Sequence, residues 1–255
     1  MSDQNQVRAG QAARRRCEVF LGIVCPMANE RETAVEFVNA VLEQCKGFKS
    51  VKFFAVLDHS CKDGTFDLLK EQQNRLPELQ VIWAPENRCV VDGYIRGYNE
   101  ALKAECDWIL EMDAGFSHQP ADTPQFFDKM AQGYDCVFGS RFCAGGRFTD
   151  APLSRYLISR WGSIITNLLI GTKLKDMTSG FELFTNAALR KVLDRGITSR
   201  GHFFQTEIKT YCRDLRIAEA PIHYRKPSQN VDTGIIVDAF VNLFRLFRRR
   251  LKGNL

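Results

Sequence analysis

Short apolar runs alternate with helix-length amphipathic segments through the first half of the chain, and this alternation limits the possible folds more than any other feature. Strands that alternate with helices favour a mostly parallel sheet with helices on its faces. The runs predict strands at 19–24, 51–57, 79–84, 107–112 and 134–139. The segments between them predict helices at about 30–45, 65–75, 91–104 and 122–132. The fold class is therefore α/β, with a Rossmann-like nucleotide-binding first half.

The second half has a different pattern. A long helix is expected near 153–171, followed by a Thr-Ser-Gly turn, a short strand and more helix. With 255 residues, 45% of them hydrophobic, the chain can build a substantial core. We expect one domain over 17–230, whose second half completes a cleft, after a disordered basic tail at 1–16.

Composition narrows the classes of protein. The net charge of +5 suits anionic partners without choosing among them. The nine cysteines are scattered and form no Cys-x-x-Cys pair, which indicates reduced thiols instead of a disulfide frame or a zinc site. The sequence shows no signal peptide, and no run reaches the roughly 18 apolar residues of a membrane span. We expect a protein that is soluble or lies on a membrane surface.

Polar residues recur just after the predicted strands, where parallel strands deliver their loops to one edge of a sheet and ligands commonly bind. In chain order these polar residues are Asn29, Glu30, Asp58, Asp63, Arg88, Glu111, Asp113 and Arg141, and Pro26 and Gly93 are further candidates in the same loops. Taken singly, several have structural explanations, such as a loop cap for Asp58 or a first-turn acid for Glu30. Five such loops in order favour a binding site.

Seven short motifs carry a resemblance over residues 18–230. They are Pro26-x-x-Asn29-Glu30, Asp58 to Thr65, Asp113-Ala114-Gly115, Gly139-Ser140-Arg141-Phe142, Arg155 to Ser159-Arg160, Asp176-Met177-Thr178-Ser179-Gly180-Phe181 and Phe204-Gln205-x-Glu207. As an ordered set, they resemble inverting glycosyltransferases of family two, which have the GT-A fold. The last three favour the dolichyl-phosphate mannose synthase branch, which glycosylates polyprenyl phosphates.

The resemblance implies a hexosyltransferase that moves a sugar from GDP-mannose or a UDP-sugar to a polyprenyl phosphate with inversion. Asp113 would hold the metal and diphosphate. Arg141 and Arg155 would bind the acceptor phosphate, with Arg160 beside them. The nucleotide sugar would contact Pro26, Asn29, Glu30, Asp58, Asp63, Arg88 and Gly93.

The chain departs from the family at the metal motif, because Gly115 stands where the last Asp of Asp-x-Asp is usual. Glu111 and Asp113 are two residues apart on a strand and should project to the same face. We expect Mg²⁺ or Mn²⁺ bound by Asp113, with Glu111 as a weaker second ligand. A site made by Asp113 and His118, or no metal at all, are the alternatives.

Two other functions remain open. A family-two enzyme that acts on a saccharide hydroxyl would need a general base, for which Asp176 or Glu207 are candidates. A phosphate acceptor is already ionised and needs none. The third possibility is a catalytically weak binding protein that kept the fold.

Residues 231–255 predict a basic amphipathic helix with an apolar stripe. The helix could dock on the core, but its aromatic stripe and arginines favour contact with an anionic membrane. We therefore expect a peripheral protein at the cytoplasmic face of the membrane, with no nucleic-acid partner. The stripe consists of Val237, Phe240, Phe244, Phe247 and Leu251, and Asp238, Asn242, Arg245 and Arg249 lie opposite.

Overall fold

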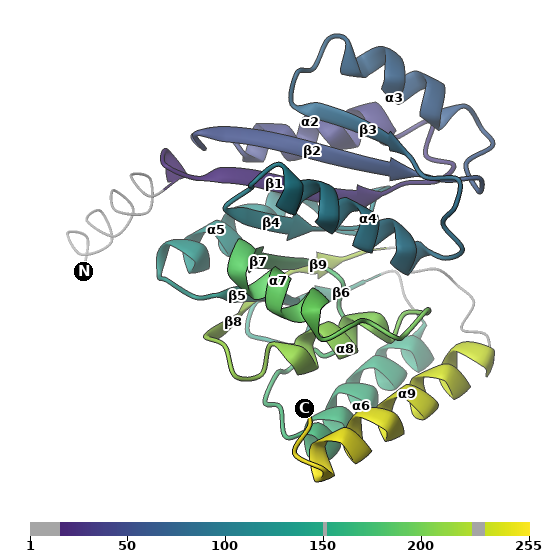
Figure 1. The fold of residues 1–255 in the computed structure, drawn as a ribbon, viewed down its shortest axis with the longest axis vertical. Helices are drawn as coiled ribbons and strands as arrows, with labels where there is room; N and C mark the ends of the chain where they lie inside the picture. Colours follow the sequence, from purple (N-terminus) through teal and green to yellow (C-terminus); the bar gives the residue numbers. More distant parts are fainter. Residues whose placement is uncertain (1–15, 150–151, 226–232) are drawn as a thin grey trace.

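A computed structural model describes residues 16–149, 152–225 and 233–255, and within them the chain builds one seven-stranded sheet (Figure 1). The strand order is β3-β2-β1-β4-β7-β5-β8. The strands are β1 (Phe20–Pro26), β2 (Ser50–Leu57), β3 (Leu79–Trp83), β4 (Trp108–Glu111), β5 (Cys136–Ser140), β7 (Glu182–Thr185) and β8 (Ile217–Pro221). Almost all of the predicted tail at 1–16 lies outside the described residues.

The helices follow the predicted alternation within a few residues. They are α2 (Ala34–Gln44), α3 (Thr65–Gln73), α4 (Val90–Lys103), α5 (Thr123–Ala131), α6 (Leu153–Ile170), α7 (Asn186–Asp194), α8 (Phe204–Tyr211) and α9 (Thr233–Leu251). A 3₁₀ turn, η1 (Pro120–Asp122), precedes α5, and a small parallel pair joins β6 (Arg147–Phe148) to β9 (His223–Tyr224). Helices α6 and α9 lie side by side at one end of the molecule (Figure 1).

The sheet is mostly parallel, as predicted, with one exception. Strand β7 runs antiparallel to both of its neighbours, β4 and β5. It lies between β4, the strand that carries Glu111, and β5, the strand that leads to Arg141. The pairing also sets Glu111 directly opposite Glu182.

Close packing of α4 on the sheet depends on two glycines, Gly93 and Gly97. A Cβ at Gly97 would lie 2.3 Å from a methyl carbon of Val24 on β1. At Gly93, a Cβ would lie 3.4 Å from Pro26. Because neither position carries a Cβ, the first half of α4 can lie against the end of β1. This is the edge of the sheet where β1, β2, β4 and β5 all end.

Two of the predictions from composition can be compared with the structure. Among the cysteines, eight are free thiols: Cys25, Cys45, Cys61, Cys89, Cys106, Cys136, Cys143 and Cys212. Among the helices of the described segments, none is long and apolar enough to cross a membrane.

Candidate active site

Two adjoining cavities open at the edge of the sheet where the parallel strands end, with volumes of about 630 Å³ and 300 Å³. Pro26, Ala28 and Val90 line both, so the two cavities lie next to each other. The predicted site residues divide between them. The larger cavity is lined by Glu30, Asp113, Arg141 and Arg155, and the smaller by Asp58, Arg88 and Gly93.

Asn29 ties the loops after β1 and β2 together. Its backbone has a positive φ of 57°. Its side-chain amide donates to the Ser60 carbonyl at 3.0 Å, and its side-chain oxygen accepts from the backbone N–H of Lys62 at 2.9 Å. Asn29 is not among the lining residues of either cavity. Its part in the site is therefore to shape the two loops.

The loop after β2 places one aspartate in the smaller cavity and uses the other as a helix cap. Asp58 Oδ1 accepts from the N–H and the hydroxyl of Ser60, at 2.8 and 2.6 Å. Asp63 accepts from the hydroxyl and N–H of Thr65, at the start of α3, and from the N–H of Arg31. The Thr65 hydroxyl is the main cause that lowers the pKa of Asp63 to about 2. Asp63 therefore acts as a loop anchor.

Arg88, two residues before α4, is held at the smaller cavity by an acid in the first turn of that helix. Its Nε lies 2.9 Å from Asp92 Oδ2, and its backbone N–H donates to the same oxygen. Bonding to Asp92 raises the pKa of the Arg88 guanidinium. The cation is thus fixed near Asp58 by α4.

Asp113, in the loop after β4, lines the larger cavity, and 41% of its side chain is exposed. The Tyr94 hydroxyl donates to its Oδ1. Its backbone N–H donates to His118 Nδ1 at 2.9 Å, so the neutral ring carries its proton on Nε2. His118 is buried and stacks on Phe181, and burial lowers its pKa. His118 is therefore a neutral ring that positions the loop of Asp113.

Glu111 projects to the same side as Asp113, because Tyr98 and Tyr94, one turn apart on α4, donate to these two carboxylates. However, Glu111 is fully buried, and its other oxygen accepts from Gln205. Burial, followed by the charge of Glu182, raises its pKa well above the usual value. This position contradicts the prediction of Glu111 as a second metal ligand, because the carboxyl lies inside the core and its oxygens are already bonded.

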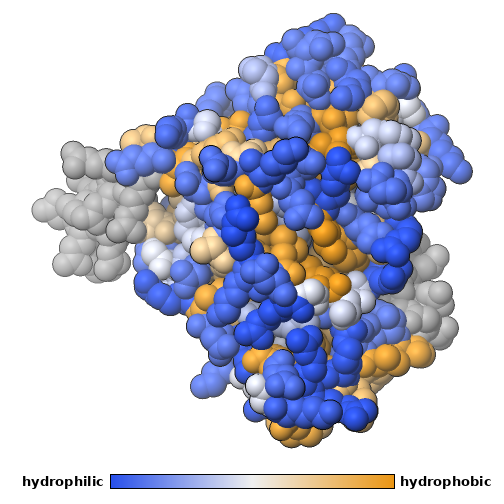
Figure 2. All heavy atoms as spheres, viewed as in Figure 1, coloured by the Kyte–Doolittle hydropathy of each residue, from blue (hydrophilic) through white to orange (hydrophobic). Residues whose placement is uncertain are grey.

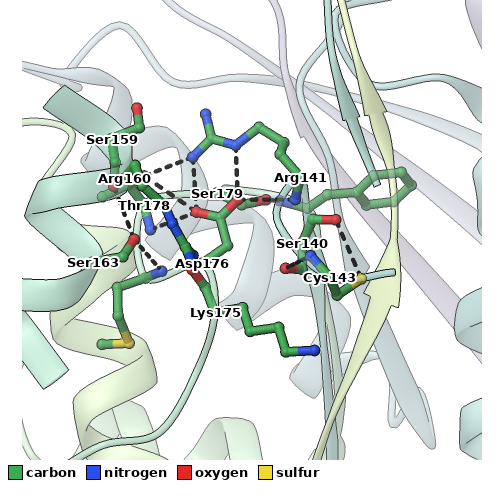
Figure 3. A network of polar contacts seen from close by, with 12 residues as sticks. Ser140, Arg141, Cys143, Ser159, Arg160, Ser163, Lys175, Asp176, Thr178 and Ser179 are labelled. Atoms are coloured by element: carbon green, nitrogen blue, oxygen red, sulfur yellow. Dashed lines mark hydrogen bonds and ion pairs between the residues drawn. The ribbon is translucent and has the colours of Figure 1, made fainter. Parts of the chain in front are cut away.

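Arg141 lies in a buried ion pair at the wall of the larger cavity (Figure 3). Its Nε and Nη2 donate to the two oxygens of Asp176 at 2.7 and 2.8 Å, and Nη2 also donates to Thr178. Figure 3 shows the remaining guanidinium nitrogen pointing away from Asp176. The guanidinium also lies 5.1 Å from the ring centre of Phe148 and 5.5 Å from that of Tyr224.

The other two predicted acceptor arginines differ in position. Arg155, near the start of α6, is half-buried and lines the larger cavity. Arg160 donates to the Lys175 carbonyl at 3.3 Å and lies over the ring of Phe142. It is not among the residues that line the cavity. The structure thus brings Arg141 and Arg155 together and leaves Arg160 outside.

Both candidate general bases are buried. Asp176 is bonded to Arg141, which outweighs the effect of burial and lowers its pKa. Glu207 accepts from Thr198, Ser199 and Tyr211, and its pKa is also lowered against the effect of burial. Neither carboxylate lines the larger cavity. They are therefore not placed to take a proton from an acceptor hydroxyl.

The sequence analysis missed the two tyrosines of α4. Tyr94 and Tyr98 are four residues apart, as suits one helix face, and Glu111 and Asp113 are two apart, as suits one strand face. These matching spacings could have predicted that each tyrosine bonds to one of the two carboxylates.

Comparison with known proteins gives a consistent family. A model of glycosyl transferase family 2 matches residues 22–193. An undecaprenyl-phosphate mannosyltransferase of Micrococcus luteus is 31% identical over 195 residues, which cover 74% of this chain and 80% of the relative. A polyprenol monophosphomannose synthase of Mycolicibacterium smegmatis is 25% identical over 205 residues, 79% of this chain and 76% of the relative.

Solved structures support the same fold. Glucosyl-3-phosphoglycerate synthase of Mycobacterium tuberculosis, in complex with UDP, aligns with a TM-score of 0.64 at 14% identity, covering 94% of this chain and 83% of that one. A complex of that enzyme with Mn²⁺, UDP and phosphoglyceric acid aligns with a TM-score of 0.61, also at 14% identity, covering 94% and 81%. The likeness confirms the predicted GT-A-like α/β fold.

Proposed function

Because the chain belongs to glycosyl transferase family 2, we propose that it transfers a hexose from a nucleotide sugar to a polyprenyl phosphate, with inversion at the anomeric carbon. The two curated relatives carry names that specify polyprenyl or undecaprenyl phosphate chemistry and mannose. The observation that carries the choice of acceptor is the pair Arg141 and Arg155 in one cavity, together with the burial of both candidate bases.

A phosphate monoester suits this cavity better than a hydroxyl. Its oxygen is already a nucleophile, and cations are needed to offset its repulsion from the donor diphosphate. The charge of Arg141 is offset by its ion pair with Asp176, so Arg155 supplies most of the free positive charge. The phosphate oxygen attacks the anomeric carbon, the bond from that carbon to the diphosphate breaks, and the nucleoside diphosphate leaves with the electron pair.

The donor would span both cavities. The smaller cavity, with Asp58 and Arg88, would hold the nucleoside, and Asp58 would accept from an N–H of the base. Pro26 and Ala28, which line both cavities, lie between that cavity and Asp113. The diphosphate would therefore lie near Asp113 and the sugar farther inside the larger cavity.

A divalent cation fits this arrangement in part. The exposed carboxylate of Asp113 is the kind of hard oxygen donor that Mg²⁺ and Mn²⁺ prefer. When bound, such an ion neutralises charge that develops on the leaving diphosphate. Tyr94 and His118 fix the loop so that Asp113 presents its carboxylate to the cavity.

The helices beside the cavity support binding at a membrane surface. Asn242, Arg245 and Arg249 of α9 face the protein, where Arg245 pairs with Glu207 at 3.0 Å and Arg249 donates to Tyr211. The apolar side of α9 faces outward, with Phe240 and Phe244 each 60% exposed. This helix thus docks by a mixed face, on which Leu243 and Leu246 are buried next to Asn242, while much of its apolar surface faces outward.

Helix α6 extends the apolar surface. Its exposed residues adjoin those of α9, and Figure 2 shows hydrophobic side chains at the end of the molecule where the two helices lie. We infer that this surface rests on the cytoplasmic face of an anionic membrane, next to the cavity that receives the lipid phosphate. The apolar surface consists of Leu153, Leu157, Ile158, Trp161, Ile164, Leu168, Val237, Phe240, Val241, Phe244 and Leu251.

A transfer assay tests the acceptor. The full chain is incubated with GDP-mannose or UDP-glucose and one of three acceptors: a polyprenyl phosphate, the matching polyprenol or an oligosaccharide. We expect sugar transfer to the phosphate alone. Transfer to the alcohol or saccharide would support the hydroxyl-acceptor function instead. Nucleotide binding without transfer to any acceptor would identify a binding protein.

A further inference from the structure

Gly115 leaves a space in the β4 loop that another carboxylate fills. The residue has a φ of +70°, and a Cβ built on it would lie 2.8 Å from Glu30 Oε1 and 2.9 Å from Oε2. Both oxygens of Glu30 therefore lie where a side chain at position 115 would begin. Glu30 and Asp113 line the same cavity.

The backbone and its neighbours hold Glu30 in this place. Its N–H donates to the Thr65 hydroxyl at 2.9 Å, and its Oε2 accepts from the Thr33 hydroxyl at 2.8 Å. The preceding residue, Asn29, has the left-handed backbone that turns the chain at this point. Glu30 is absent from the lining of the smaller cavity, where Asp58 lies. Its carboxylate thus faces the expected diphosphate region instead of the nucleoside.

The surroundings also show a concentration of negative charge. The buried thiol of Cys25, at the end of β1, has a pKa raised by burial and then by the carboxylates of Asp113, Glu30 and Glu111. Carboxylates that line one cavity repel each other and repel a diphosphate bound there. A cation between Asp113 and Glu30 would relieve both repulsions.

We propose that Glu30 supplies the cation-binding carboxylate that the chain lacks at position 115, so that Asp113 and Glu30 together hold the divalent ion. The inference rests on the proposed function, in which a metal accompanies the donor diphosphate. It replaces the nucleoside contact expected for Glu30 from the sequence with a ligand role. It also gives a reason for the glycine, since any side chain at 115 would displace the Glu30 carboxylate.

The first test measures Mn²⁺ binding to the full chain by electron paramagnetic resonance, with GDP and with UDP. Glu30→Gln keeps the shape and removes the charge, and we expect it to weaken Mn²⁺ affinity roughly tenfold or more. Glu32→Gln, at an exposed acid two residues along, is the matched control for net charge and should bind Mn²⁺ like the wild type. Nucleotide binding in EDTA should be the same in all three proteins.

The second test moves the carboxylate. Glu30→Ser removes the carboxylate and clears the space above position 115, and Gly115→Asp then introduces a new one there. Asp tolerates the left-handed backbone better than most residues. We expect Glu30→Ser to lose Mn²⁺ affinity and the double variant Glu30→Ser/Gly115→Asp to regain most of it. Circular dichroism checks that each variant is folded.

The outcomes separate this inference from the proposed function. If the wild type binds Mn²⁺ with nucleotide and Glu30→Gln binds it equally well, the ligand role of Glu30 is wrong and metal dependence stands. If Glu30→Gln weakens nucleotide binding equally with Mn²⁺ and EDTA, Glu30 contacts the nucleotide directly and the inference is again overturned. A wild type that binds no Mn²⁺ with either nucleotide overturns the metal dependence and the inference together, while sugar transfer can still be measured.

Discussion

Arg141 and Arg155 line one cavity, but only Arg141 has its charge paired with a buried acid in the described residues. Arg141 is 7% exposed and forms a bidentate pair with the buried Asp176. Arg155 is half-buried at the start of α6 and reaches the cavity without a comparable acid partner in the described residues. One arginine therefore also supports the fold, whereas the other is placed mainly to bind an anion.

We expect Arg155→Ala to reduce sugar transfer strongly while donor binding stays near that of the wild type. Loss of a charge-assisted phosphate contact should cost roughly 2–4 kcal/mol of transition-state stabilisation. Initial rates with a polyprenyl phosphate and nucleotide titrations measure the two effects. Arg75→Ala, just after α3 and outside the lining of both cavities, is the control. Unchanged turnover in Arg155→Ala would contradict the acceptor role.

Arg141→Ala should instead damage both activity and stability. It leaves the Asp176 carboxylate buried without its cation, and breaking such a pair costs about 3–5 kcal/mol. Urea unfolding of this variant should show a clearly lower free energy of unfolding than Arg155→Ala shows. Equal stability of the two variants would mean that the ion pair contributes little to the fold.

At the scale of elements, local patterns predicted the helices and most strands, but not their partners. The strand expected at 134–139 is β5 at Cys136–Ser140, and the helix expected near 153–171 is α6 at Leu153–Ile170. The antiparallel insertion of β7 could not be predicted, because strand order depends on contacts between distant segments. For the same reason the burial of Glu111 was missed: its partner Gln205 is 94 residues away.

The apolar surface of α6 and α9 should bind anionic vesicles, with weaker binding at high salt because of the nearby arginines. Phe240→Ser/Phe244→Ser removes two exposed rings and should reduce co-sedimentation without unfolding the protein. Trp83→Ser, which removes an exposed ring on β3 at the other end of the molecule, is the control. Deleting the whole helix is a poorer test, because Leu243 and Leu246 belong to the core. Equal sedimentation of both variants would contradict the proposed surface.

At the scale of the whole molecule, a buried charge network joins the two halves of the chain beneath the site. Lys209 on α8 lies 2.7 Å from Glu182 on β7, and both are fully buried. Glu111 on β4 lies opposite Glu182. One lysine cannot neutralise two acids, so burial favours a proton on one of them. The pKa of Glu182 is raised to about 7, and that of Glu111 is raised well above its usual value, in both cases chiefly by burial.

This network predicts a stability that falls as the pH rises. A carboxyl whose pKa is raised on folding contributes stability that is complete below about 4.5 and is lost as the pH rises through its folded value, here about 7 for Glu182. Each such group changes the free energy of unfolding by at most about 1.4 kcal/mol per pH unit. His118, with a lowered pKa, acts in the opposite direction only up to about 6.5.

Urea unfolding between about pH 6.5 and pH 8 measures the effect. The wild type should lose stability across this range, and Glu111→Gln, which mimics the protonated acid, should lose less. Glu32→Gln, an exposed acid, should follow the wild type. A wild-type stability that is flat or rises over this range would mean that the buried acids are ionised throughout.

The outward-facing apolar side chains of α9 have a consequence for how the protein reaches a bilayer. An isolated amphipathic peptide is unordered in water and loses conformational entropy when it folds on lipid. Here the ion pair from Arg245 to Glu207 and the burial of Leu246 already fix the helix. The hydrophobic face is thus formed before any lipid arrives. Binding to the membrane therefore carries no further loss of conformational entropy for folding the helix. Adsorption would be a rigid-body encounter, with the same helix content in solution and on the lipid.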